Sequence, residues 1–120
     1  MPHKPRYWVI IAAAGVGRRM AADRPKQYLK RQQSTLIEQS IAPFISHPDI
    51  SQVLVALHPN DPYWSTLDIS HADKVVTTAG GDKRADTVLN GLKFLATQAH
   101  EQDWVIVHDA ARPYLSVDLL

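Results

Sequence analysis

The fold is decided by the stretch Trp8–Lys26, whose sequence is WVIIAAAGVGRRMAADRPK. Residues 8–14 are apolar, as in a parallel strand that is buried on both faces. Gly15 and Gly17 follow, and small residues at the end of a strand let backbone N–H groups approach a ligand closely. Cations come next, among them Arg18, Arg19 and, after a short gap, Lys26. Because cations after such a turn favour an anion, the stretch predicts a strand that presents a phosphate-binding loop.

The same alternation of apolar strand and helix continues downstream. We expect strands at residues 52–57, 74–78 and 104–108. Thr35 and Glu38 have the spacing of a capping box that begins a helix, which Pro43 should kink or end early. The alternation predicts an α/β fold, with a doubly wound, mostly parallel, Rossmann-like sheet.

A second helix is predicted from apolar residues that recur at spacings of three and four. Its apolar face is expected to hold Ala85, Val88, Leu89, Leu92, Ala96 and Ala99. Gly91 lies inside this helix at a cost of about 1 kcal/mol relative to alanine. That cost suggests that the glycine allows close packing on the sheet.

Composition limits the classes of function. The chain has 120 residues, 45% of them hydrophobic and 21% charged, as expected for one globular domain. A net charge of +1 argues against nucleic acid or a membrane surface as partner. The absence of cysteine excludes disulfides and thiolate metal sites. His3, Lys4 and Arg6 imitate a signal peptide, but the apolar run after them is short, so we expect a cytoplasmic protein without a membrane span.

Three loops follow strand ends and should meet at one edge of the sheet, where such folds bind ligands. The first is residues 13–26. The second, residues 80–87, brings glycines, Asp82, Arg84 and Thr87 to a helix N-terminus, which favours anions or polar base edges. In the third, residues 109–113, Asp109 could hold a divalent cation that bridges phosphates. Together the loops predict a nucleoside triphosphate site with magnesium.

Each piece also has a simpler interpretation. The glycines could form an ordinary turn, and Arg18 could be solvated. Asp82 could be only the N-cap of the helix, and Arg84 could pair with Asp86 at the surface. Asp109 could cap a turn and pack against Arg112. These alternatives stay open for the single loops, and the coincidence of three loops favours the functional interpretation.

Several common nucleotide and metal motifs are not matched. The dinucleotide fingerprint fails because its third small position falls on Met20, which disfavours an oxidoreductase domain. The P-loop fails because no Gly-Lys-Ser/Thr follows the glycines. The six histidines show no HxxH or HxxxH spacing, so a zinc site is not expected.

Three sequence blocks carry a resemblance to a known family. AAAGVGRRM-x5-KQYL (12–29), GGDKRADTV (80–88) and VHDAARP (107–113) resemble the motifs of the 2-C-methyl-D-erythritol 4-phosphate cytidylyltransferases of the non-mevalonate isoprenoid pathway. The blocks occur in the family's order, and the similarity covers essentially the whole chain. The resemblance implies a sheet of the nucleotidyltransferase type, in which residues 1–120 are the CTP-binding N-terminal part of a single domain.

The resemblance also implies roles for individual residues. Arg19 and Lys26 match the two catalytic cations that stabilise the transition state at the α-phosphate. Asp109 matches a family position that lies near the metal-bound phosphates. The nucleotide-binding positions are Ala12, Ala13, Ala14, Gly15, Gly17, Gly81, Asp82, Thr87 and Ala110. Arg84 and Arg112 match positions that are structural or adjacent to the ligand. The family usually has proline where this chain has Ala12 and serine where it has Thr87.

The reaction implied is cytidylyl transfer from CTP to 2-C-methyl-D-erythritol 4-phosphate, with release of pyrophosphate and with Mg²⁺ or another divalent cation as cofactor. Full-length members of the family are longer, and their second half supplies the acceptor pocket and the arm of a homodimer. We therefore expect the chain to be truncated, and residues 1–120 alone to bind CTP weakly without forming product. The alternatives are a pentitol-phosphate cytidylyltransferase and a non-catalytic nucleotide-binding fragment.

Overall fold

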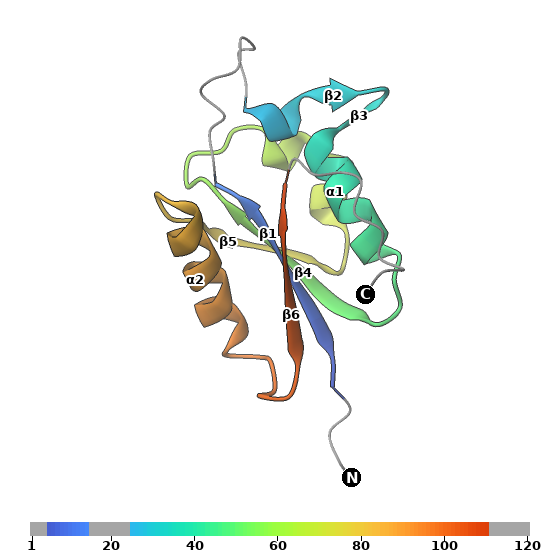
Figure 1. The fold of residues 1–120 in the computed structure, drawn as a ribbon. Coiled ribbons are helices and arrows are strands. Elements are labelled where there is room, and N and C mark those ends of the chain that lie inside the picture. Colours follow the sequence, from blue (N-terminus) through green and yellow to red (C-terminus); the bar gives the residue numbers. More distant parts are fainter. Residues whose placement is uncertain (1–4, 15–24, 111–120) are drawn as a thin grey trace.

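The computed structural model describes residues 5–14 and 25–110. Its centre is a sheet of four parallel strands in the order β5-β4-β1-β6 (Figure 1). The strands are β1 (Tyr7–Ala13), β4 (Ile50–Leu57), β5 (Val75–Ala79) and β6 (Trp104–Asp109). All four predicted strands are confirmed, with bounds that differ by one or two residues at their ends.

Two helices cover opposite faces of this sheet, α1 (Leu36–Ile45) and α2 (Arg84–Leu95) (Figure 1). The chain first winds outward from β1 through β4 to β5, and then crosses to β6 on the other side of β1. The predicted doubly wound α/β fold is therefore confirmed. The order of the strands reverses between β1 and β6, and ligands of open α/β sheets bind at such a switch point.

Strand β1 divides the core into two layers. Val9 and Ile11 belong to the cluster that includes Ile41 of α1, whereas Ile10 packs in the cluster that includes Leu95 of α2. These side chains are at most 1% exposed. Burial of a side chain of this size contributes roughly 1.5–3 kcal/mol, so the apolar run fixes β1 as the central strand.

Helix α1 begins at the predicted capping box. The backbone N–H of Thr35 donates to Glu38 Oε1 at 2.9 Å, and the N–H of Glu38 donates to Thr35 Oγ1 at 3.3 Å. The helix runs through Pro43 and ends at Ile45, so the proline does not end it. Close to a helix end, a proline removes one backbone hydrogen bond, while Ile41 and Phe44 stay fully buried on the sheet.

The buried face of α2 differs from the predicted one. Thr87, Gly91 and Leu95 are buried, whereas Leu89 and Leu92 are 48% and 41% exposed. A Cβ atom at Gly91 would lie 3.0 Å from Ile10 Cδ1, which confirms the predicted close packing of this glycine. The face is therefore set by the approach of the helix backbone to β1, and Leu89 and Leu92 turn outward.

Short elements that the sequence did not predict complete the fold. A 3-10 helix, η1 (Lys26–Tyr28), leads into a small antiparallel hairpin of β2 (Lys30–Arg31) and β3 (Ser34–Thr35), whose turn holds Gln32 at φ 64°. Two further 3-10 helices, η2 (Trp64–Thr66) and η3 (Asp68–His71), connect β4 to β5. Within the described ranges, no helix has the length and apolar character needed to cross a membrane.

Candidate active site

A cavity of about 390 Å³ lies at the edge of the sheet where β1 and β6 end. Its volume is in the range of small-molecule sites. It is lined by residues from β1, η1, the segment before α2, α2 itself and the end of β6: Ala12, Ala14, Gln27, Gly81, Asp82, Lys83, Arg84, Thr87, Asp109 and Ala110. Described residues of all three predicted loops therefore line one cavity, beside the switch point.

The loop after β5 lies directly against the end of β1. A Cβ atom at Gly80 would be only 2.3 Å from Ala14 Cβ, and the Gly80 N–H donates to the Leu57 carbonyl at 2.7 Å. A Cβ atom at Gly81 would lie 2.3 Å from Asp86 Cβ. Both positions require glycine because other chain atoms occupy the space of a side chain.

Thr87 holds the glycine loop in place. Its hydroxyl accepts the Gly81 N–H at 3.0 Å and lies 3.3 Å from the Gly81 carbonyl, and the residue is 2% exposed. Lys83 is the N-cap of α2, so the interpretation of Asp82 as an N-cap is wrong. Asp82 instead stands exposed at the cavity, one residue before the cap.

An ion pair spans the cavity between two of the loops. Arg84 Nε lies 2.9 Å from Asp109 Oδ1, with side-chain exposures of 60% and 33%. In the described part of the chain, Arg84 thus pairs with Asp109 and not with Asp86. A pair this exposed contributes little to stability, and its main effect is to fix the direction of the Asp109 carboxylate.

The end of β6 is held from two sides. The Ala110 N–H donates to the Ala12 carbonyl at 3.2 Å, which extends the pairing of β6 with β1. On the other side, the buried Ser40 hydroxyl of α1 lies 3.0 Å from the Ala110 carbonyl. The cavity wall formed by Asp109 and Ala110 is therefore attached to both the sheet and a helix.

The donor set suits magnesium that arrives with a polyphosphate. The described residues contain no group of three or more His, Cys, Asp or Glu side chains that could hold a metal ion by themselves. Mg²⁺ is usually bound by one or two carboxylates together with phosphate oxygens and waters. The Asp109 carboxylate at the cavity fits that role.

The remaining predicted residues fall into two groups. Lys26 begins η1 and is exposed, while its neighbour Gln27 lines the cavity. Gly15, Gly17, Arg19 and Arg112 lie outside the described residues. Sequence reasoning missed Gln27 and Lys83, because a polar residue beside a cation resembles ordinary solvated surface. The position of both within the quoted motif blocks is the signal that could have identified them.

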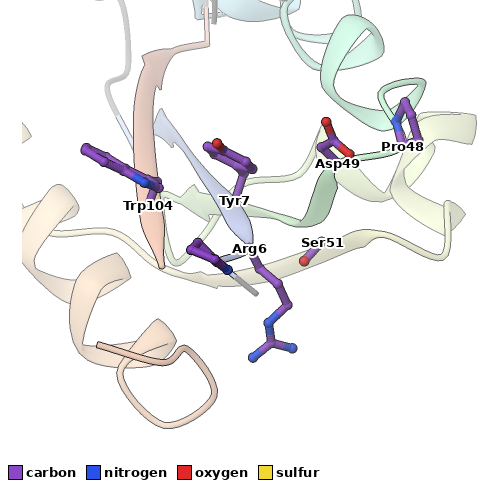
Figure 2. A pocket seen from close by; sticks show the side chains of 7 residues that line it. Arg6, Tyr7, Pro48, Asp49, Ser51 and Trp104 are labelled. Atoms are coloured by element: carbon purple, nitrogen blue, oxygen red, sulfur yellow. The ribbon is translucent and has the colours of Figure 1, made fainter. Parts of the chain in front are cut away.

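A second cavity, of about 810 Å³, lies at the opposite edge of the sheet (Figure 2). It is lined by Pro5, Arg6, Tyr7, Pro48, Asp49, Ser51 and Trp104. Arg6, the cation that lines this cavity, already has two partners. Its Nε lies 3.6 Å from Asp103 Oδ2, and its guanidinium lies 5.0 Å from the Trp8 ring centroid. None of the predicted site residues lines this cavity, so the smaller one is the candidate active site.

The parallel sheet, its switch point and the charged cavity there define the class as a doubly wound α/β protein of the nucleotide-binding type. A family model described as IspD, 2-C-methyl-D-erythritol 4-phosphate cytidylyltransferase, matches residues 7–120. The chain belongs to this family.

Individual relatives agree with that assignment. The 2-C-methyl-D-erythritol 4-phosphate cytidylyltransferase of Vibrio vulnificus is 53% identical over 104 residues, which are 87% of this chain and 44% of the relative. That of Pseudomonas putida is 50% identical over 113 residues, covering 93% of this chain and 48% of the relative. The chain therefore spans about half the length of these relatives.

Solved structures show the same fold. The crystal structure of the Francisella tularensis 2-C-methyl-D-erythritol 4-phosphate cytidylyltransferase superposes with a TM-score of 0.74 at 37% identity, covering 94% of this chain and 48% of that one. A structure of a 4-diphosphocytidyl-2C-methyl-D-erythritol synthase gives a TM-score of 0.79 at 32% identity, covering 95% and 50%.

Proposed function

We propose that the complete gene product carrying residues 1–120 transfers the cytidylyl group of CTP to 2-C-methyl-D-erythritol 4-phosphate, in isoprenoid biosynthesis. One observation carries the proposal: three motif blocks of the family converge on a single cavity at the switch point of the sheet. The relatives' names favour this acceptor over a pentitol phosphate.

The reaction is an in-line displacement. An oxygen of the acceptor phosphate attacks the α-phosphorus of CTP, the new P–O bond forms, and pyrophosphate leaves with the electron pair of the broken bond. Charge builds on the equatorial oxygens, so catalysis consists mainly of positioning and electrostatic stabilisation. Arg19 and Lys26 suit this task because they supply positive charge without a proton transfer.

The loop before α2 is the proposed reader of the base. The exposed Asp82 carboxylate can accept a hydrogen bond from the exocyclic amino group of cytosine, a donor that uracil lacks. Gly81 offers its backbone at the same place, and Thr87 fixes it through the hydrogen bond to the Gly81 N–H. Discrimination between CTP and UTP would thus reside in this loop.

Asp109 is the proposed ligand of Mg²⁺, oriented by Arg84. When bound, the ion neutralises the triphosphate and improves the leaving group. We also propose a cytoplasmic homodimer. The cysteine-free composition is consistent with a reducing compartment, and the dimer is what the family resemblance implies.

The test is pyrophosphate release by the complete gene product from each of the four nucleoside triphosphates, with methylerythritol phosphate or a pentitol phosphate as acceptor. We expect release only with CTP, methylerythritol phosphate and Mg²⁺. Faster release with the pentitol phosphate would support the alternative enzyme. If no combination of nucleotide and acceptor releases pyrophosphate, the result would support a non-catalytic nucleotide-binding protein. Residues 1–120 alone should bind CTP without turnover.

The role of Lys26 can be tested separately. Lys26→Ala should lower kcat on the order of 10²–10³-fold with a smaller change in KM for CTP, as for the loss of a preorganised donor. Lys30→Ala is the matched control, because Lys30 is exposed on the same segment. Equal losses in kcat and in CTP affinity would assign Lys26 to ground-state binding instead.

A further inference from the structure

The two residues after Lys26 are buried although both are polar. Gln27 is 7% exposed and Tyr28 is 1% exposed, whereas Lys26 itself is exposed. The turn is short and tight, since the Tyr28 N–H donates to the Pro25 carbonyl at 2.9 Å and the Leu29 N–H to the Lys26 carbonyl at 3.1 Å. Lys26 therefore projects from a backbone whose next residues are fixed in the core.

Gln27 attaches this turn to the central strand. Its side-chain Nε2 donates to the carbonyl of Ala13, the last residue of β1, at 2.8 Å in a buried setting. Buried hydrogen bonds of this kind are costly to break because the freed groups are not solvated. The turn is thereby held next to the strand that opens the candidate active site.

Tyr28 attaches the turn to a second place, the segment that follows β4. Its hydroxyl donates to Asp61 Oδ2 at 2.5 Å, and Asp61 Oδ1 accepts the N–H groups of Tyr63 and Trp64 at 2.7 and 3.1 Å. Burial raises the pKa of the Tyr28 phenol, and the bond and charge of Asp61 add to this effect. The phenol thus stays protonated and keeps donating.

We propose that Gln27 and the Tyr28–Asp61 pair are positioning residues for Lys26. The inference rests on the proposed function, in which Lys26 faces the α-phosphate. A lysine side chain is a point charge on a flexible four-carbon stem, so the protein controls its place mainly through the backbone that carries it. A displacement of about 1 Å in a catalytic group can cost roughly 100-fold in rate.

The decisive variant is Tyr28→Phe in the complete gene product, because it removes one hydroxyl and keeps the buried ring. We expect kcat to fall on the order of 10-fold, with KM for CTP unchanged within about twofold. In a Lys26→Ala background the same substitution should not lower kcat further, since Tyr28 acts through Lys26. An equal effect in both backgrounds, or an unchanged kcat, would overturn the proposal.

Trp8→Phe is the matched control. Trp8 is a buried aromatic residue whose Nε1–H donates to Asp103 Oδ2 at 2.9 Å, at the opposite edge of the sheet. We expect this variant to lower the Tm while kcat is retained. If it lowers kcat as much as Tyr28→Phe does, the effect is general destabilisation and the positioning role is refuted.

A second measurement separates this inference from the proposed function. Amide hydrogen exchange at Tyr28 and Leu29 should accelerate in Tyr28→Phe and in Asp61→Asn, because the turn loses its anchor. If the protection of both amides is unchanged, Tyr28 and Asp61 do not anchor the turn, and the inference is refuted even if the enzyme is active. An inactive wild-type protein whose Tyr28→Phe variant exchanges faster would refute the proposed function alone.

Discussion

Replacing Gly80 by alanine should force apart two loops that frame the candidate active site. The added methyl group would lie 2.3 Å from Ala14 Cβ and 3.1 Å from Thr87 Oγ1. Carbon atoms in contact are about 3.5–4.0 Å apart, so the loops must separate by more than ~1 Å. The φ angle of Gly80 lies outside the left-handed region, which leaves the clash as the cause. Overpacking of this kind costs about 1–3 kcal/mol of unfolding free energy.

Urea unfolding, monitored by tryptophan fluorescence, would measure the lost unfolding free energy. Titration with CTP would measure the effect of the substitution on nucleotide binding. We expect weaker CTP binding as well, because Gly81 moves with Gly80. The double variant Ala14→Gly/Gly80→Ala is the sharp control, since it removes the methyl group that clashes. It should recover more than half of the lost stability. Independent, additive effects of the two substitutions would refute the reasoning.

Three further predictions concern stability. Pro43→Ala should raise the unfolding free energy by about 1 kcal/mol in urea titrations, because alanine restores a helical N–H near the end of α1. Ser40→Ala should lower it by about 1 kcal/mol, because the Ala110 carbonyl loses its buried partner. Tyr28 has a raised pKa when folded, so its contribution is complete below about pH 10 and is lost as the pH rises above that value. The difference in stability between wild type and Tyr28→Phe should therefore stay constant up to about pH 9 and shrink as the pH rises from about 10 to 11.

The sequence predicted the parts of the fold that depend on local patterns. The apolar run of β1 and the capping box at Thr35 are short-range signals, and both are confirmed. The convergence of three loops followed from topology alone, since parallel strands present their carboxyl ends at one edge.

The predictions that were wrong concerned contacts between segments that are distant in the sequence. The spacing of apolar residues predicted that α2 buries Leu89 and Leu92. The close approach of Gly91 to Ile10 instead leaves both leucines exposed. Arg84 has a carboxylate two residues away in sequence, yet its partner is Asp109 at the end of another strand. Periodicity and sequence neighbourhood carry no information about such pairings, which exist only once the sheet has formed.

The central place of β1 has a consequence for how the chain is made. Asp103, at the entry to β6, accepts the backbone N–H of Arg6, 97 residues earlier. At a synthesis rate of about 5–20 residues per second, the β6 side of β1 waits roughly 5–20 s for its partner to emerge. During that time Trp8–Ile11, whose side chains are buried in the folded sheet, lacks one neighbouring strand. Among the four described strands of this sheet, β1 is made first but gains its second neighbour only when β6 emerges, so nascent chains of this protein should depend on protection of that segment.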